Sequence, residues 1–186
     1  MSNRKSERTS AVVTGKNVYL RKPAQRDLTE FVALNQSSAK LHRGLVSAPV
    51  SSAQFAAFLK RSRQTESACF LLCRVEDDRI VGAINLSQIF LGGFRSAYLG
   101  YYMCSPYERR GYMSEGLGLI LRYAFKQLKL HRLEANIQPQ NRASIALVKR
   151  AGFVREGYSK RYLKVCGQWR DHERWAILSE DWKLRR

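Results

Sequence analysis

The stretch that decides the fold is Tyr102-Met103-Cys104-Ser105-Pro106-Tyr107-Glu108-Arg109-Arg110-Gly111-Tyr112-Met113-Ser114. It starts as a strand, passes through a tight basic turn and enters a helix with one continuous apolar stripe. The first N–H groups of a helix have no partner within the helix, and the helix dipole adds partial positive charge there. Arg109 and Arg110 add formal charge, and Gly111 lets the backbone approach an anion closely. The turn therefore predicts a pyrophosphate site.

The rest of the chain alternates between strand and helix patterns. Upstream we expect strands over residues 18–21, 68–75, 80–89 and 96–104, and two helices, one opened by Asp27 and one capped by Ser51 or Ser52. Downstream we expect helices over 113–128 and 142–151, and strands over 132–138, 153–158, 162–165 and 169–178. A strand-helix-strand crossover requires a parallel pair. These patterns predict an α/β (α+β) fold with a mixed, mostly antiparallel sheet flanked by helices.

A second motif lies downstream, at Asn141-Arg142-Ala143-Ser144-Ile145-Ala146-Leu147-Val148-Lys149-Arg150-Ala151-Gly152-Phe153. Asn141 is a good helix N-cap, and Gly152 stands where a left-handed C-terminal residue belongs. Together with the basic turn, this segment resembles the GNAT family of acyl-CoA N-acyltransferases. The helix signature of that family, N-x-x-S-x-x-L-x-x-R-x-G-F, is matched at every defined position.

The turn departs from its own family signature, Q/R-x-x-G-x-G/A, at two positions. Glu108 stands where Gln or Arg is usual, and Met113 stands where Gly or Ala is usual. Because the turn binds phosphate mainly through backbone amides, we expect Glu108 to weaken the site without abolishing it. Met113 predicts a more crowded phosphate loop.

Within the family, the chain looks closest to the ribosomal-protein-alanine N-acetyltransferase branch. The supporting segments are Leu20-Arg21, Tyr98-Leu99-Gly100-Tyr101, His131-Arg132-Leu133-Glu134, Glu156-Gly157-Tyr158 and Gly167-Gln168-Trp169-Arg170-Asp171-His172. The resemblance implies a single GNAT domain over residues 16–182, with acetyl-CoA in a cleft between two splayed central strands. Residues 1–15 are then a basic tail and a candidate for disorder, and residues 183–186 a second basic tail.

The resemblance also implies roles for individual residues. Main-chain groups of Tyr102, Met103 and Cys104 pair with the pantetheine arm like an added strand, and one amide binds the oxyanion. The pyrophosphate lies on Arg109, Arg110, Gly111, Tyr112, Met113 and Ser114. Asn136 and Asn141 complete the cofactor-binding set. Ser144, near the departing sulfur, stabilises or protonates the thiolate; a plain N-cap for Asn141 and a first-turn helix serine for Ser144 are the structural alternatives.

The implied reaction is direct acetyl transfer to an amine that has lost its proton. An α-amino group has a pKa of about 7.7–8.0, so a sizeable minority is neutral in a cytosol and a strong base is less necessary than for lysine. Glu134 is the first candidate base, acting through water, and a structural carboxylate is its alternative. Tyr98, Tyr101, Asp171 and Glu173 are lesser candidates.

The charge of the chain is strongly positive. Thirty-three Lys and Arg against 15 Asp and Glu give a formal charge of +18, which attracts coenzyme A, RNA and acidic protein surfaces alike. A solvated surface rich in Lys and Arg is the plain alternative. The four cysteines form no C-x-x-C pair and the three histidines have no metal-ligand spacing, so we expect no metal. We see no signal-peptide run and no membrane span, and expect a cytoplasmic protein without a membrane partner.

Three functions stay open. The first is acetylation of a protein or peptide N-terminus, such as that of a ribosome-associated protein, whose RNA-rich surroundings would attract the positive charge. The second is acetylation of a small amine such as a polyamine, amino acid or antibiotic, although a cationic amine prefers an acidic pocket and this chain has few acids. The third is a basic RNA-binding module, which leaves residues 141–153 unexplained. Sequence-specific nucleic-acid binding is not expected, and monomer and dimer are both open.

Overall fold

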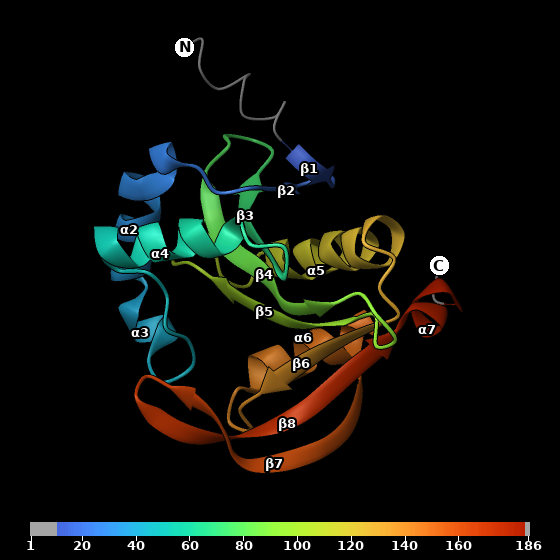
Figure 1. Ribbon diagram of the computed structural model, residues 1–186. Coiled ribbons are helices and arrows are strands. Elements are labelled where there is room, and N and C mark those ends of the chain that lie inside the picture. The colour runs from blue at the N-terminus through green and yellow to red at the C-terminus, as the bar shows by residue number, and fades with distance from the viewer. Residues whose placement is uncertain (1–10, 185–186) are drawn as a thin grey trace.

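The strands form one mixed sheet in the order β1-β2-β3-β4-β5-β6-β8-β7 within residues 11–184, the part of the chain that the computed structural model describes (Figure 1). Neighbouring strands are antiparallel except β5 and β6, which are parallel. The strands are β1 (Ala11–Thr14), β2 (Val18–Arg21), β3 (Ser67–Arg74), β4 (Ile80–Phe90), β5 (Ser96–Met103), β6 (Arg132–Ile137), β7 (Val154–Val165) and β8 (Gln168–Leu178). The predicted mixed, mostly antiparallel sheet is confirmed.

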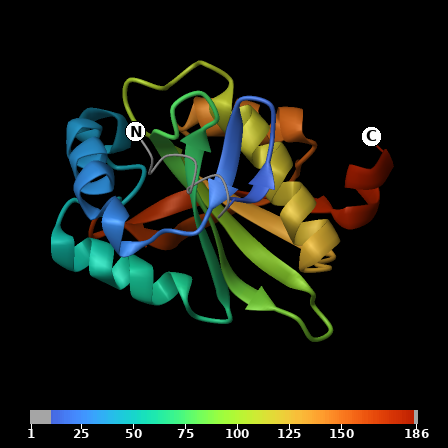
Figure 2. The same cartoon turned by 90° about the horizontal axis from the view of Figure 1, so that it is seen from above.

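Helices cover both faces of the sheet (Figure 2). On one face lie α2 (Leu28–Ser37) and α4 (Ser52–Ser62), over a cluster of Phe31, Phe55 and Phe58. On the other lie α5 (Tyr112–Arg122) and α6 (Arg142–Ala151), over a larger cluster that includes Leu117 and Val148. The short elements are η1 (Gln25–Asp27), α3 (Ala39–His42), η2 (Tyr123–Gln127) and α7 (Ser179–Leu184).

The structure differs from the sequence expectations at short elements. Residues 11–14, assigned above to the basic tail, form β1 and pair with β2, whereas residues 1–10 and 185–186 of the two tails lie outside the described residues. The helices α3 and α7 were not predicted, because four and six residues are too few to display a helical period. The two strands expected over 153–165 are one strand, β7, whose pairing with β8 is irregular at two places.

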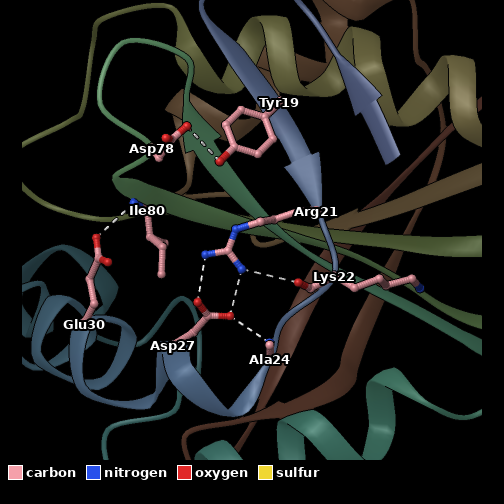
Figure 3. A network of polar contacts seen from close by, with 8 residues as sticks. All are labelled: Tyr19, Arg21, Lys22, Ala24, Asp27, Glu30, Asp78 and Ile80. Carbon is pink, nitrogen blue, oxygen red and sulfur yellow. Dashed lines mark hydrogen bonds and ion pairs between the residues drawn. The ribbon is translucent and has the colours of Figure 1, made fainter. Parts of the chain in front are cut away.

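A buried ion pair fixes the start of α2 (Figure 3). The guanidinium of Arg21 donates to both carboxylate oxygens of Asp27, at 2.7 and 2.8 Å, and the two side chains are 2% and 4% exposed. The main-chain N–H of Ala24 donates to Asp27 as well, at 2.7 Å. Asp27 thus links the start of α2 to β2 and to the turn between them. Its side chain makes no capping hydrogen bond to α2 itself. Glu30 accepts from the N–H of Ile80 at 3.1 Å, which ties α2 to β4.

Candidate functional site

The parallel strands β5 and β6 pair over a short distance and then separate. Their register runs from Ser96 opposite Arg132 to Tyr98 opposite Glu134, whereas β5 continues to Met103 and β6 to Ile137. Beyond the last pair, each strand presents to the other main-chain groups that no partner strand uses on that side. The split is the only parallel junction in the described sheet, and it produces a cleft at the carboxyl ends of both strands.

A cavity of about 490 Å³ opens at this split. Four segments line it: the stretch after α2, the end of β5, the basic turn with the start of α5, and one side of α6 from its N-cap to its last turn. The lining residues are Leu41, His42, Leu45, Val46, Tyr101, Tyr102, Met103, Tyr107, Glu108, Arg109, Arg110, Gly111, Tyr112, Met113, Ser114, Asn141, Ala143, Ser144, Ala146, Leu147 and Arg150. The two sequence motifs, far apart in the chain, therefore meet at one cavity.

The basic turn has the backbone that an anion site requires. Arg109 and Gly111 both have a left-handed backbone, with φ of 59° and 79°, and α5 begins at the next residue, Tyr112. The side chains of Arg109 and Arg110 are exposed. A Cβ on Gly111 would meet nothing within 4 Å, so it is the left-handed φ, and not lack of space, that favours glycine here. Met113 is 7% exposed and packs into the larger core cluster.

Arg74, at the end of β3, contacts two tyrosines that flank the basic turn, Tyr107 and Tyr112. Its guanidinium lies 5.6 Å from the Tyr107 ring and donates to the Tyr112 hydroxyl at 3.4 Å. It also donates to Asp77 at 3.0 Å; the Arg74 guanidinium lowers the pKa of the Asp77 carboxyl, and the pKa of Arg74 rises. No sequence signal identified Arg74, because only the sheet order brings β3 next to the turn.

The start of α6 forms the opposite wall. The side-chain oxygen of Asn141 accepts from the N–H of Ser144 at 3.1 Å, and Gly152 ends the helix with φ of 98°, so both predicted caps are confirmed. The hydroxyl of Tyr101, from β5, donates to the main-chain oxygen of Ser144 at 3.4 Å. Burial raises the pKa of Tyr101 to about 12, and its hydroxyl therefore keeps its proton at neutral pH. Tyr101 and Ser144, which each carry a hydroxyl group, therefore both line this end of the cavity.

Cys104 lies outside the cavity lining. Its N–H already donates to Val81 in the neighbouring strand, at 2.8 Å, and its thiol lies 3.6 Å from the side-chain oxygen of Asn35. Burial raises the pKa of this thiol to about 12. Of the three residues predicted to pair with pantetheine, Tyr102 and Met103 line the cavity, and the role of Cys104 stays a prediction.

Glu134 and Asn136, on β6, are also outside the lining. Glu134 stands at the last paired position of β5 and β6 and accepts from Arg132 at 3.0 Å; Arg132 in turn binds Glu156. The side-chain oxygen of Asn136 is buried and has no hydrogen-bond partner among the described residues. Neither residue lines the cavity, and the roles expected for both stay predictions.

The lesser base candidates are also engaged in local contacts. Asp171 accepts from the hydroxyl of Tyr158 and the N–H of Arg161, and Glu173 accepts from the indole N–H of Trp175 at 3.0 Å. Within residues 11–184, no three His, Cys, Asp or Glu side chains are grouped so that they could hold a metal ion. No helix in this part of the chain is long and apolar enough to cross a membrane.

The geometry defines a class of protein. A left-handed basic turn at a helix start suits a diphosphate, and the unpaired strand edges beside it suit an extended arm that contains amides. The chain matches the family described as Acetyltransferase (GNAT) domain over residues 17–154, more than half of its length. It therefore belongs to the GNAT acetyltransferases and is an N-acetyltransferase, as the two motifs predicted.

Individual relatives agree with this assignment. The [Ribosomal protein uS5]-alanine N-acetyltransferase of Escherichia coli is 38% identical over 120 residues, which cover 64% of this chain and 62% of that protein, less than two thirds of its length. The solved structure of Mycobacterium smegmatis RimJ in complex with CoA-disulfide has a TM-score of 0.81 at 27% identity and covers 88% of this chain and 82% of its own.

A third similarity concerns the fold alone. Spermidine N-acetyltransferase from Vibrio cholerae, in complex with CoA and spermine, has a TM-score of 0.77 at 20% identity, covering 89% of this chain and 98% of that one. The same architecture occurs in the solved Ribosomal-protein-S5-alanine Acetyltransferase from Vibrio fischeri, with a TM-score of 0.78, so it is found in an enzyme named for a protein and in one named for a polyamine. The fold by itself does not select the acceptor amine.

Proposed function

We propose that this enzyme transfers the acetyl group of acetyl-CoA to the N-terminal amine of a protein, and that a ribosomal protein is the substrate. The observation that carries the proposal is the cavity at the split of β5 and β6, where the basic turn and the Asn141–Ser144 cap meet. The similarity to the uS5-alanine enzyme of E. coli supports the choice of substrate. The reaction would take place in the cytoplasm, where ribosomal proteins are made.

The cavity fits acetyl-CoA in three respects. The turn offers left-handed backbone at Arg109 and Gly111 together with exposed guanidinium groups. The end of β5, at Tyr102 and Met103, has no β6 partner, and its main-chain groups other than the Met103 carbonyl, which His42 binds, can pair with the amides of the pantetheine arm. A main-chain N–H of that segment would bind the oxyanion, and Asn141 would bond the arm.

The chemistry requires an amine, a thioester and a proton donor. The neutral amine attacks the thioester carbon and a C–N bond forms. The C–S bond then breaks with its electron pair on sulfur, and the proton that the new amide nitrogen loses ends on that sulfur, so that coenzyme A leaves as the thiol. Ser144 lines the cavity beside Tyr101, where its hydroxyl can stabilise or protonate the leaving thiolate. Because transfer is direct, none of the cysteines is required as a nucleophile.

The charges around the cavity favour a singly charged acceptor. Among its described lining residues, Glu108 is the one acid, against Arg109, Arg110 and Arg150. A polyamine carries several positive charges and would be repelled, whereas an α-amine has one charge and loses it readily, with a pKa of about 7.7–8.0. This balance is the reason to prefer a protein N-terminus over a polyamine.

The test is an acceptor panel with acetyl-CoA. The panel contains peptides that begin with Ala or Ser, the same peptides with a blocked N-terminus, and spermidine, and release of coenzyme A is followed with a thiol reagent. We expect turnover only on the free N-terminal peptides, and mass spectrometry should place the acetyl group on the α-amine. Turnover on spermidine alone would overturn the proposed acceptor but leave the acetyltransferase assignment intact.

A further inference from the structure

One segment crosses the open end of the cleft. Residues 41–47, here called the strap, follow α2 and connect three parts of the sheet. His42 binds the main-chain oxygen of Met103 on β5 through Nε2, at 2.8 Å. Gln138, just after β6, donates to the main-chain oxygen of Gly44 at 2.7 Å. Figure 1 shows the loop after α3 reaching the end of the β7–β8 hairpin, where Cys166 Sγ lies 3.7 Å from Ser47 Oγ.

His42 is the strap residue with acid–base chemistry. It is only 7% exposed, yet it lines the cavity, and its ring stands edge-on to that of Tyr102 at a centroid distance of 5.0 Å. The partner of Nε2 is a carbonyl oxygen, which can only accept. Nε2 therefore carries the hydrogen, and in the neutral ring Nδ1 holds the lone pair.

We propose that His42 is a catalytic residue that takes the proton of the acceptor ammonium on Nδ1. This proposal rests on the proposed acetyl transfer. In the step, an N–H bond of the ammonium breaks, its electron pair stays on the amine nitrogen, and the proton goes to Nδ1. The resulting imidazolium still donates from Nε2 to Met103, and this hydrogen bond becomes charge-assisted. The neutral amine then attacks the thioester.

The other candidate groups are less suited to the task. Glu134 lies outside the cavity lining and is paired with Arg132. Tyr101 and Tyr102 do line the cavity, but burial raises the pKa of both phenols, so they keep their protons and cannot act as bases. Histidine is the side chain that exchanges a proton between pH 5 and 8, where an α-amine also starts to titrate.

Two substitutions at His42 separate a base from a structural anchor. His42→Gln places an amide nitrogen near the position of Nε2, which can still donate to Met103 but offers no base. His42→Ala removes both functions. We expect His42→Gln to lower kcat about tenfold at pH 7 on an α-amine, because only about a tenth of that amine is neutral without a base. KM for acetyl-CoA and the coenzyme A thermal shift should stay within twofold of wild type. His131→Gln, at an exposed histidine paired with Glu180 outside the cavity, is the matched control and should keep wild-type kcat.

Either of two results would overturn the proposal that His42 is the base. Full kcat in His42→Gln with a loss only in His42→Ala would make His42 an anchor for Met103. Loss of acetyl-CoA affinity with kcat retained would make it part of the cofactor wall. All variants are assayed on whichever amine of the panel the wild-type enzyme acetylates. A wild type that uses spermidine would thus refute the proposed acceptor, while the His42 variants would still report on the base.

Discussion

The two walls of the cleft are built in different ways. The basic turn and α5 come from one continuous stretch, and their geometry follows from local backbone, with left-handed residues at Arg109 and Gly111. The strap has no such local pattern, and contacts with β5, β6 and the β7–β8 turn hold it in place. The basic turn can be recognised in the sequence because its conformation depends on neighbouring residues. The strap can be found only in the structure because contacts with distant residues hold it. Four substitutions would break or sharpen this contrast.

The largest effect is expected at Asp27, before α2, in a segment that neither motif includes. Asp27→Ala removes the carboxylate that accepts two hydrogen bonds from the buried Arg21 guanidinium, and breaking a buried ion pair on one side destabilises a protein by about 3–5 kcal/mol. Urea unfolding measures the loss. The double variant Arg21→Met/Asp27→Leu is the control, because it removes both charges and should recover much of the stability. Equal loss in the single and double variants would argue against the broken ion pair as the cause.

The second effect belongs to the turn, at Gly111. Gly111→Val puts a β-branched residue at φ of 79°, a strain of about 1–3 kcal/mol that the free turn relieves by leaving this conformation. Restoring the conformation to bind coenzyme A then weakens the affinity by about 5- to 150-fold. Isothermal titration with coenzyme A measures it. Gly118→Val, an exposed position of α5 where a Cβ would also meet nothing within 4 Å, should bind normally. Unchanged affinity in the Gly111 variant would reject the phosphate site.

A third, smaller effect compares two helix caps. Asn141 caps α6 through Ser144 at 3.1 Å, and Ser51 caps α4 through Gln54 at 3.3 Å on the other face of the sheet. Replacing either residue with Ala should cost about 1 kcal/mol of stability. Only Asn141→Ala should also weaken coenzyme A binding, because only that cap lines the cavity. Equal coenzyme A affinity in both variants would leave Asn141 as a plain cap.

The smallest effect depends on pH and concerns Glu115 in α5. Burial alone would raise the pKa of this carboxyl, but hydrogen bonds from Asn17 and Val18 outweigh burial and lower it. A pKa that is lower in the folded state adds stability above the unfolded-state value, and this stability is lost as pH falls through the folded value. Glu115→Gln should therefore cost about 1 kcal/mol at pH 7 and little at pH 3. Urea unfolding at both values is the measurement, and a constant difference would contradict this origin.

Much of the fold could be predicted from the spacing of apolar residues and from the capping and turn residues between the elements. The Ser51 cap and the crossover from β5 through α5 to β6 both follow from local sequence patterns. The strand β1 and the helix α3 could not be predicted from the sequence, because segments of four residues are stabilised mainly by the elements packed against them.

The candidate site divides in the same way. Asn141, Ser144 and the turn residues carry a local motif, and the structure brings them to one cavity. His42 and Arg74 were not predicted, because a single histidine in an unpredicted four-residue helix and an arginine at a strand end carry no local motif. Glu134 was predicted as a base, and the structure adds the Arg132 pair that engages it.

The amino-acid sequence by itself determined the family, the anion-binding turn and the capped helix that faces it, since backbone conformation at Gly111 and capping at Asn141 are local properties of a few residues. Only the tertiary structure decided where the cleft opens and what crosses it. The strands β5 and β6 separate after Tyr98 and Glu134, and His42 binds Met103. Both features involve segments far apart in the chain, so the packing of the whole sheet determines them.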